Sequence, residues 1–126
     1  MISYAFEIVS GEAAAGTADV DATAGLATIT LDRPDKLNAL NAQALRELDA
    51  AYARAQQDGA RAVLLRGAGR AFCAGRDISD VDPATDDVTG LLDGLVAPLM
   101  RRIAACPAPT FAAAHGACLG VGLGLL

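Results

Sequence analysis

Residues 70–79 (RAFCAGRDIS) directly follow the apolar run 62–67 (AVLLRG). An apolar run of this length, bounded by turn residues, is typical of a buried strand. The sequence predicts that this strand leads into a tight turn at Ala74-Gly75 and that a helix begins directly after it. Backbone N–H groups at such a junction have no partner inside the helix and point outward. They could therefore form half of an oxyanion hole.

A second glycine-rich turn lies near the end of the chain. Residues 110–114 (TFAAA) predict a short strand, and residues 116–126 (GACLGVGLGLL) predict a turn that leads into an apolar helix. The sequence stops at Leu126, inside this glycine-rich region, which could supply the other half of the hole.

Composition places the chain among folded, acidic proteins. Its 126 residues are 53% hydrophobic with a net charge of −5, which suits one domain with a real core and argues against nucleic acid as a partner. The three cysteines form no C-x-x-C motif, and one histidine cannot build a metal site. We therefore expect a reducing, cytoplasmic setting and no metal.

The predicted elements alternate between strand and helix. Strands are expected at 4–10, 26–31, 62–66 and 110–114, with a loop over 11–23. Asn41 should cap a helix that runs to about Gln57, and a second helix over 89–105 should be kinked or divided by Pro98. No domain boundary interrupts this order, so the sequence predicts a single α/β domain.

Four blocks of sequence, taken in order, resemble the N-terminal half of the crotonase superfamily, the enoyl-CoA hydratase/isomerase family. They are residues 31–40 (LDRPDKLNAL), 62–67 (AVLLRG), 71–78 (AFCAGRDI), and 106–110 (CPAPT) with 114–122 (AHGACLGVG). The resemblance implies a crotonase-like (ClpP/crotonase) spiral of ββα units, of which residues 1–126 would be the N-terminal part of one domain, truncated so that the C-terminal half is absent.

Members of this family bind acyl-CoA thioesters, as in fatty acid metabolism, and stabilise an enolate between two backbone N–H groups. The resemblance implies that these donors are the N–H of Arg76 and the N–H of Val121. It implies no cofactor apart from coenzyme A as part of the substrate. It also implies a homo-oligomer, a trimer or a hexamer.

The resemblance further implies which residues hold coenzyme A. Arg33 and Lys36 would contact phosphates, although a solvated loop is an equally good interpretation of either side chain. Main-chain contacts are expected around Lys36 to Ala39, and the substrate site as a whole is expected to be lined by Leu37, Asn38, Ala39, Ala74, Gly75, Asp77, Ile78 and Gly120.

Two polar residues near the turns have simpler interpretations. The carboxylate of Asp77 is placed to cap the helix expected after Gly75, and we prefer this to a catalytic role. His115 precedes the turn glycine Gly116, where we expect a hydrogen-bonded structural histidine rather than a base.

The sequence departs from the family at the acid/base position. Hydratases carry a glutamate where this chain has Gly124, and a second glutamate would lie beyond Leu126. Adding water across a double bond needs a positioned acid/base. The leading hypothesis is therefore an enzyme of the enoyl-CoA hydratase/isomerase type, and the alternative is a truncated, non-catalytic remnant that binds acyl-CoA or a partner subunit.

Two other interpretations of the last segment are weaker. Residues 110–126 are apolar enough to suggest a membrane helix, with glycines at every fourth position from 116, but the stretch is short and lacks a basic flank. Residues 120–124 (GVGLG) are glycine-rich but lack the spacing of a dinucleotide site. We expect neither a membrane nor a dinucleotide as partner.

Overall fold

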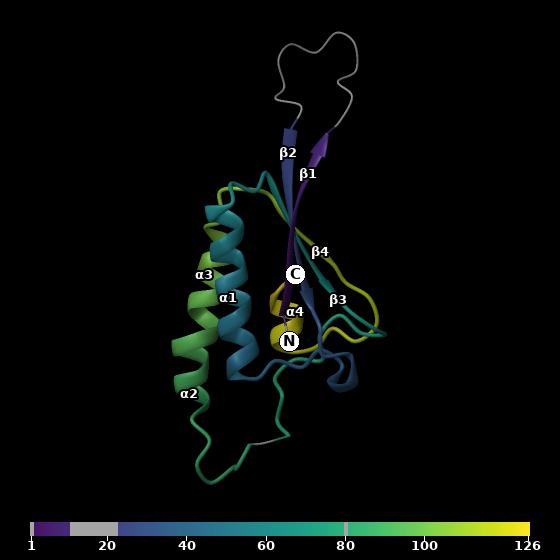
Figure 1. Cartoon of the computed structure of the whole chain (residues 1–126). Coiled ribbons are helices and arrows are strands. Elements are labelled where there is room, and N and C mark those ends of the chain that lie inside the picture. The colour runs from purple at the N-terminus through teal and green to yellow at the C-terminus, as the bar shows by residue number, and fades with distance from the viewer. Residues whose placement is uncertain (1, 11–22, 80) are drawn as a thin grey trace.

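The computed structural model describes residues 2–10, 23–79 and 81–126 and shows one four-stranded sheet in the order β1-β2-β3-β4 (Figure 1). β1 (Ile2–Ser10) pairs antiparallel with β2 (Thr23–Leu31), whereas β3 (Ala62–Gly67) and β4 (Thr110–Ala113) continue the sheet in parallel. This confirms the predicted α/β order. The loop predicted over 11–23 lies, except for Thr23 in β2, outside the described residues.

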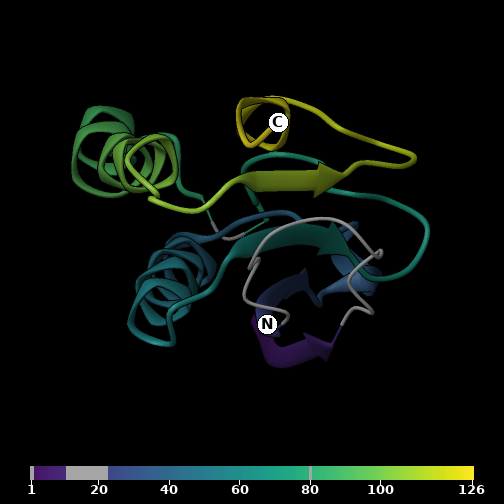
Figure 2. The ribbon, with the colours of Figure 1, turned by 90° about the horizontal axis from the view of Figure 1, so that it is seen from above.

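The parallel strands are joined by helices that lie on the same side of the sheet (Figure 2). α1 (Ala42–Gln57) connects β2 to β3 and contacts β1, β2 and α3. The connection from β3 to β4 contains α2 (Val88–Leu91), η2 (Leu92–Val96) and α3 (Ala97–Ala104). A short 3-10 turn, η1 (Pro34–Lys36), follows β2, and α4 (Val121–Gly124) lies beside β4.

α1 begins and ends as its sequence predicts. The side chain of Asn41 accepts a hydrogen bond from the N–H of Ala44, which satisfies one free donor of the first turn. At the other end Gly59 takes a φ of 70°, and the N–H of Ala60 donates to the carbonyl of Ala55. The buried residues of the helix belong to the same core as the buried residues of β2 and β3; they are Ala44, Leu45, Leu48, Ala51, Tyr52 and Ala55.

The second helical region is divided near Pro98, as predicted. Proline has no N–H to donate to the preceding turn, and it lies in the first turn of α3, directly after the change of helix type. The turn before it, η2, is a wide π-helical turn in which the N–H of Ala97 donates to the carbonyl of Leu92.

The helix predicted directly after Gly75 is wrong. In the described residues between Gly75 and Asp87 no helix forms, and the next one begins at Val88. Asp77 does not cap a helix, because Oδ1 accepts from the N–H and the hydroxyl of Ser79, at 3.0 and 2.6 Å. A short polar side chain that bonds the backbone two residues on competes with helix formation.

The last segment is not one long helix either. Residues 110–126 form β4, a glycine turn and the four-residue α4. Within the described part of the chain, no helix has the length and apolar character needed to cross a membrane.

A buried asparagine organises the loop between β2 and α1. Asn38 is 1% exposed, and its Oδ1 accepts from the N–H of Arg33 at 2.8 Å. Its Nδ2 donates to the carbonyl oxygens of Ala68 and Ala71, both at 2.8 Å. Leu37 and Asn38 have φ values of 51° and 56°, a left-handed conformation that is unfavourable for leucine and tolerable for asparagine.

We predict that Asn38→Ala lowers the free energy of unfolding by about 3 kcal/mol, because three buried or partly buried main-chain groups lose their partner. Asn38→Asp should be at least as destabilising, since a carboxylate of the same size places its charge against two carbonyl oxygens. Urea unfolding followed by circular dichroism measures both. A loss below about 1 kcal/mol for Asn38→Ala would contradict this role.

The pKa of Asp77 predicts an acid-sensitive contribution to stability. Hydrogen bonds from Ser79, and then Arg33, lower the pKa of Asp77 to about 2. A carboxyl group whose pKa is lower in the folded state stabilises the protein fully at pH values above its unfolded pKa of about 4. This stabilisation is lost as the pH falls toward 2. The urea midpoint of Asp77→Asn should therefore lie below that of the unmodified protein at pH 6, and the two should converge near pH 2. Asp93→Asn, on the exposed surface of η2, is the control; an equal gap at every pH would refute the assignment.

Candidate functional site

The structure brings the two glycine turns side by side. Cys73 and Cys118 form an isolated parallel β-bridge. The N–H of Cys73 donates to the carbonyl of Ala117 at 3.1 Å, and the N–H of Leu119 donates to the carbonyl of Cys73 at 3.0 Å. Each cysteine stands two residues before the glycine of its own turn, so this pairing aligns Gly75 with Gly120.

Both positions need glycine. Gly75 and Gly120 have φ values of 99° and 53°, in the region that side chains rarely adopt. A Cβ on Gly75 would lie 2.8 Å from the carbonyl oxygen of Leu119 and 3.8 Å from the Cα of Gly120. The close approach of the two turns therefore depends on the absence of a side chain at Gly75.

The peptide that follows each glycine carries an N–H with no acceptor among the described residues; these are the N–H groups of Arg76 and Val121. In a trans peptide the N–H points opposite to the preceding C=O. The carbonyl of Gly75 accepts from the N–H of Leu40 at 2.7 Å, so the N–H of Arg76 points away from Leu40.

The same reasoning places the second donor. The carbonyl of Gly120 accepts from the N–H groups of Leu123 and Gly124 and so points into α4. The N–H of Val121 therefore points out of the start of that helix. Over residues 2–10, 23–79 and 81–126, therefore, two adjacent turns each present a peptide N–H that has no acceptor there.

The loop between β2 and α1 supports the first turn from the other side. The N–H of Ala74 donates to the carbonyl of Leu37 at 3.0 Å, and the N–H of Asp77 donates to the carbonyl of Leu40 at 2.9 Å. The loop residues and the turn residues that were predicted to line the substrate site are therefore neighbours. The side chain of Asn38 is buried and bonds the backbone rather than facing outward.

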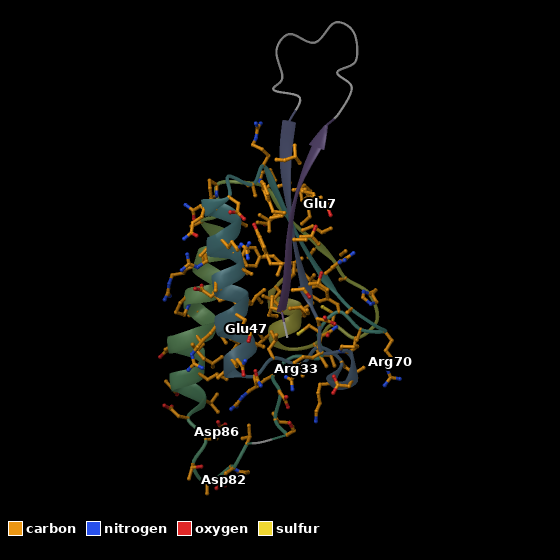
Figure 3. The ribbon with its side chains drawn as sticks, in the orientation of Figure 1. Glu7, Arg33, Glu47, Arg70, Asp82 and Asp86 are labelled. Atoms are coloured by element: carbon orange, nitrogen blue, oxygen red, sulfur yellow. The ribbon has the colours of Figure 1, made fainter. Side chains whose placement is uncertain are left out.

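The two cations of this loop have different environments. The guanidinium of Arg33 donates to the carbonyl of Ala39 at 2.9 Å and to Asp77 at 3.0 Å (Arg33 is labelled in Figure 3). Lys36 is exposed and has no ion pair within the described part of the chain. Lys36 is thus the more available of the two for an anionic ligand.

One strong interaction of the site was not predicted. The guanidinium of Arg76 forms a two-pronged ion pair with Asp86, at 2.8 and 2.5 Å. Each partner favours the charged form of the other, so the pKa of Asp86 is lowered and that of Arg76 is raised. Ten residues separate the two in sequence, and no motif connects them.

The other polar groups near the turns have structural surroundings. The Nε2 of His115 lies 2.8 Å from the carbonyl oxygen of Gly69, in agreement with the predicted structural role. Burial raises the pKa of the Cys73 thiol, which disfavours its thiolate. Gly124 lies in α4, and a Cβ there would be 3.4 Å from Met100 Cε.

Comparison with known proteins supports the resemblance. The sequence model of the family described as enoyl-CoA hydratase/isomerase matches residues 21–126. A probable enoyl-CoA hydratase of Rhodobacter capsulatus is 46% identical over 101 residues, which are 80% of this chain and 39% of that protein. The 1,2-epoxyphenylacetyl-CoA isomerase of Escherichia coli is 38% identical over 103 residues, 78% of this chain and 39% of that protein.

The fold agrees with these relatives. The crystal structure of an enoyl-CoA hydratase/carnithine racemase from Magnetospirillum magneticum superposes with a TM-score of 0.70 at 39% identity, covering 79% of this chain and 39% of that one. The chain therefore has a crotonase-like fold and spans about two fifths of the length of the relatives it matches. It belongs to the enoyl-CoA hydratase/isomerase family.

Proposed function

We propose that the two turns bind the carbonyl oxygen of an acyl-CoA thioester and stabilise the enolate formed from it. One observation carries the proposal: the N–H groups of Arg76 and Val121 have no acceptor among the residues that the structure describes, and they lie on adjacent turns. The family to which the chain belongs, and the CoA compounds in the names of its relatives, support the same substrate class.

The chemistry follows from the charge on the oxygen. When a proton leaves the carbon next to a thioester carbonyl, negative charge develops on that oxygen, and each hydrogen bond to it becomes stronger. Peptide donors suit this task because they are fixed before the reaction and carry no proton that titrates near neutral pH. Arg76 and Val121 would both serve through the main chain.

We propose that the loop after β2 holds the coenzyme A part of the substrate. Lys36 is exposed and would contact a phosphate as a point charge. Arg33 would act through the main chain that it fixes at Ala39 and through the guanidinium N–H groups that remain free. The lining is completed by Leu37, Asn38, Ala74, Gly75, Asp77, Ile78 and Gly120.

A second candidate function is binding of acyl-CoA without turnover. It is favoured by Gly124, which offers no carboxylate at the position where hydratases of this family carry one. Asp77 and Asp86, the carboxylates beside the first turn, are both engaged in ion pairs. Enolate formation separates the two functions, because a binding protein would not accelerate exchange of the α-protons.

We also propose assembly into a homo-oligomer, in the cytoplasm, with a role in fatty acid metabolism. The support for assembly is the apolar surface near β4 and α4, where Phe111, Leu123 and Leu126 are exposed. Exposed apolar side chains that lie close together commonly mark a surface that another protein chain or another part of the same protein covers.

We predict that Val121→Pro reduces the exchange of α-protons of acyl-CoA with D2O by about 10²- to 10³-fold, the usual effect of losing one such donor. Proline fits at the first position of α4, because the N–H removed has no partner inside the helix. Val121→Ala, which keeps the N–H, is the matched control. Exchange is followed by mass spectrometry, and acyl-CoA affinity by calorimetry.

At the first donor, α-proton exchange by Arg76→Pro is compared with exchange by Arg76→Ala. Both variants lose the ion pair with Asp86, and only the proline variant also loses the peptide N–H. Thioesters with a 13C-labelled carbonyl should show a smaller downshift of the infrared C=O stretch with either proline variant. Unchanged exchange and an unchanged stretch in both would rule out the proposed hole. Normal binding without exchange in the unmodified protein would favour the second function.

We expect Lys36→Ala to weaken coenzyme A binding about fivefold, because an exposed charge contact contributes about 1 kcal/mol or less. The effect should shrink as salt is added and should be absent with the shorter acyl-pantetheine, which lacks the nucleotide phosphates. Arg61→Ala, just before β3, is the control for net charge. Equal losses in both variants would assign the effect to net charge alone.

A further inference from the structure

The Arg76–Asp86 ion pair borders an open hollow of about 410 Å3 beside the first glycine turn. The other lining residues are apolar: Ile78, Val81, Pro83 and Val88. Ile78 and Val88 are 71% and 46% exposed, so their apolar surface is available to a ligand rather than used in the core. The hollow is thus apolar except for one cation and one anion that face each other.

These two charges cancel. The guanidinium of Arg76 donates two hydrogen bonds to the two carboxylate oxygens of Asp86. The side chains of Arg76 and Asp86 are only 26% and 18% exposed. A cation neutralised in this way is a weak receptor for a second carboxylate. Without Asp86, the same guanidinium would be a partly buried, uncompensated charge, which strongly favours an anionic partner.

The surrounding charges are also negative. Asp82 and Asp86 lie on the segment that leads into α2 (Figure 3), and Asp87 follows directly. The carboxylates of Asp82 and Asp87 accept only main-chain N–H groups, from Ala84 and Gly90. Neither is neutralised by a cation within the described residues, so the segment that contributes Val81, Pro83 and Val88 to the hollow carries negative charge that repels anions.

We propose that Asp86 is a specificity-determining residue: by neutralising Arg76 it makes this hollow accept apolar acyl groups and reject acyl groups that end in a carboxylate. The inference rests on the proposed function, because the hollow is lined by Arg76, the residue whose peptide N–H is proposed to bind the thioester oxygen. Residue 76 would then act twice, through its N–H on the thioester and through its side chain on the far part of the acyl group.

The experiment compares hexanoyl-CoA with adipoyl-CoA, which have acyl chains of equal length and differ in a terminal carboxylate. The unmodified protein should bind hexanoyl-CoA more tightly. Asp86→Asn keeps the size of the side chain and removes its charge, and the ratio of the two dissociation constants should shift at least about tenfold toward adipoyl-CoA. Added salt should reduce that shift.

Asp87→Asn is the matched control, because asparagine caps a helix as well as aspartate does and the same net charge is lost one residue away. The double variant Arg76→Gln with Asp86→Asn should return the ratio to that of the unmodified protein, since no free cation remains. Circular dichroism verifies the fold of each variant.

The outcomes separate this inference from the proposed function. If neither thioester binds to the unmodified protein, the proposed function fails and this inference with it. If both bind but the ratio is the same in Asp86→Asn and Asp87→Asn, only the specificity role is overturned. A preference of the unmodified protein for adipoyl-CoA would overturn it as well.

Discussion

The candidate site depends on main-chain hydrogen bonds that hold one turn from both sides. On one side Cys73 pairs with the strand that leads to Gly120, and on the other Ala74, Gly75 and Asp77 pair with the loop at Leu37 and Leu40. Because these partners come from two parts of the chain that are both distant from the turn in sequence, the turn has a fixed conformation only in the folded protein. The buried amide of Asn38 links the loop to the end of β3 and so fixes the outer support.

Charged side chains beside the first turn form ion pairs. The chain is acidic overall, yet Arg33 is matched to Asp77 and Arg76 to Asp86, at the two edges of the first turn. Within each pair the positive and the negative charge largely offset each other. Among the described residues, the N–H groups of Arg76 and Val121 have no acceptor, so each adds a partial positive charge where its turn faces outward.

The sequence predicted those parts of the fold that depend on local pattern. The N-cap at Asn41, the apolar face of α1 and the division near Pro98 follow from spacing and from backbone chemistry that act within a few residues. The predicted helix after Gly75 failed because Asp77 bonds Ser79 instead, a local competition that the pattern does not decide. The roles of Asn38 and Asp86 depend on partners that only the fold brings near, as does the contact between Gly75 and Gly120. Four short motifs were enough for the family, because their order reflects the whole arrangement.

The two glycines have an evolutionary consequence. Every amino acid except proline carries a peptide N–H, so a gene can exchange the side chains at positions 76 and 121 without deleting either donor. Gly75, by contrast, tolerates no side chain against the carbonyl of Leu119. Position 75 is therefore restricted to glycine during evolution, because the two backbones touch there. The side chain at position 76 can change, and selection for a new ligand can act on it. Position 76 can thus retain its peptide N–H while its side chain varies among relatives.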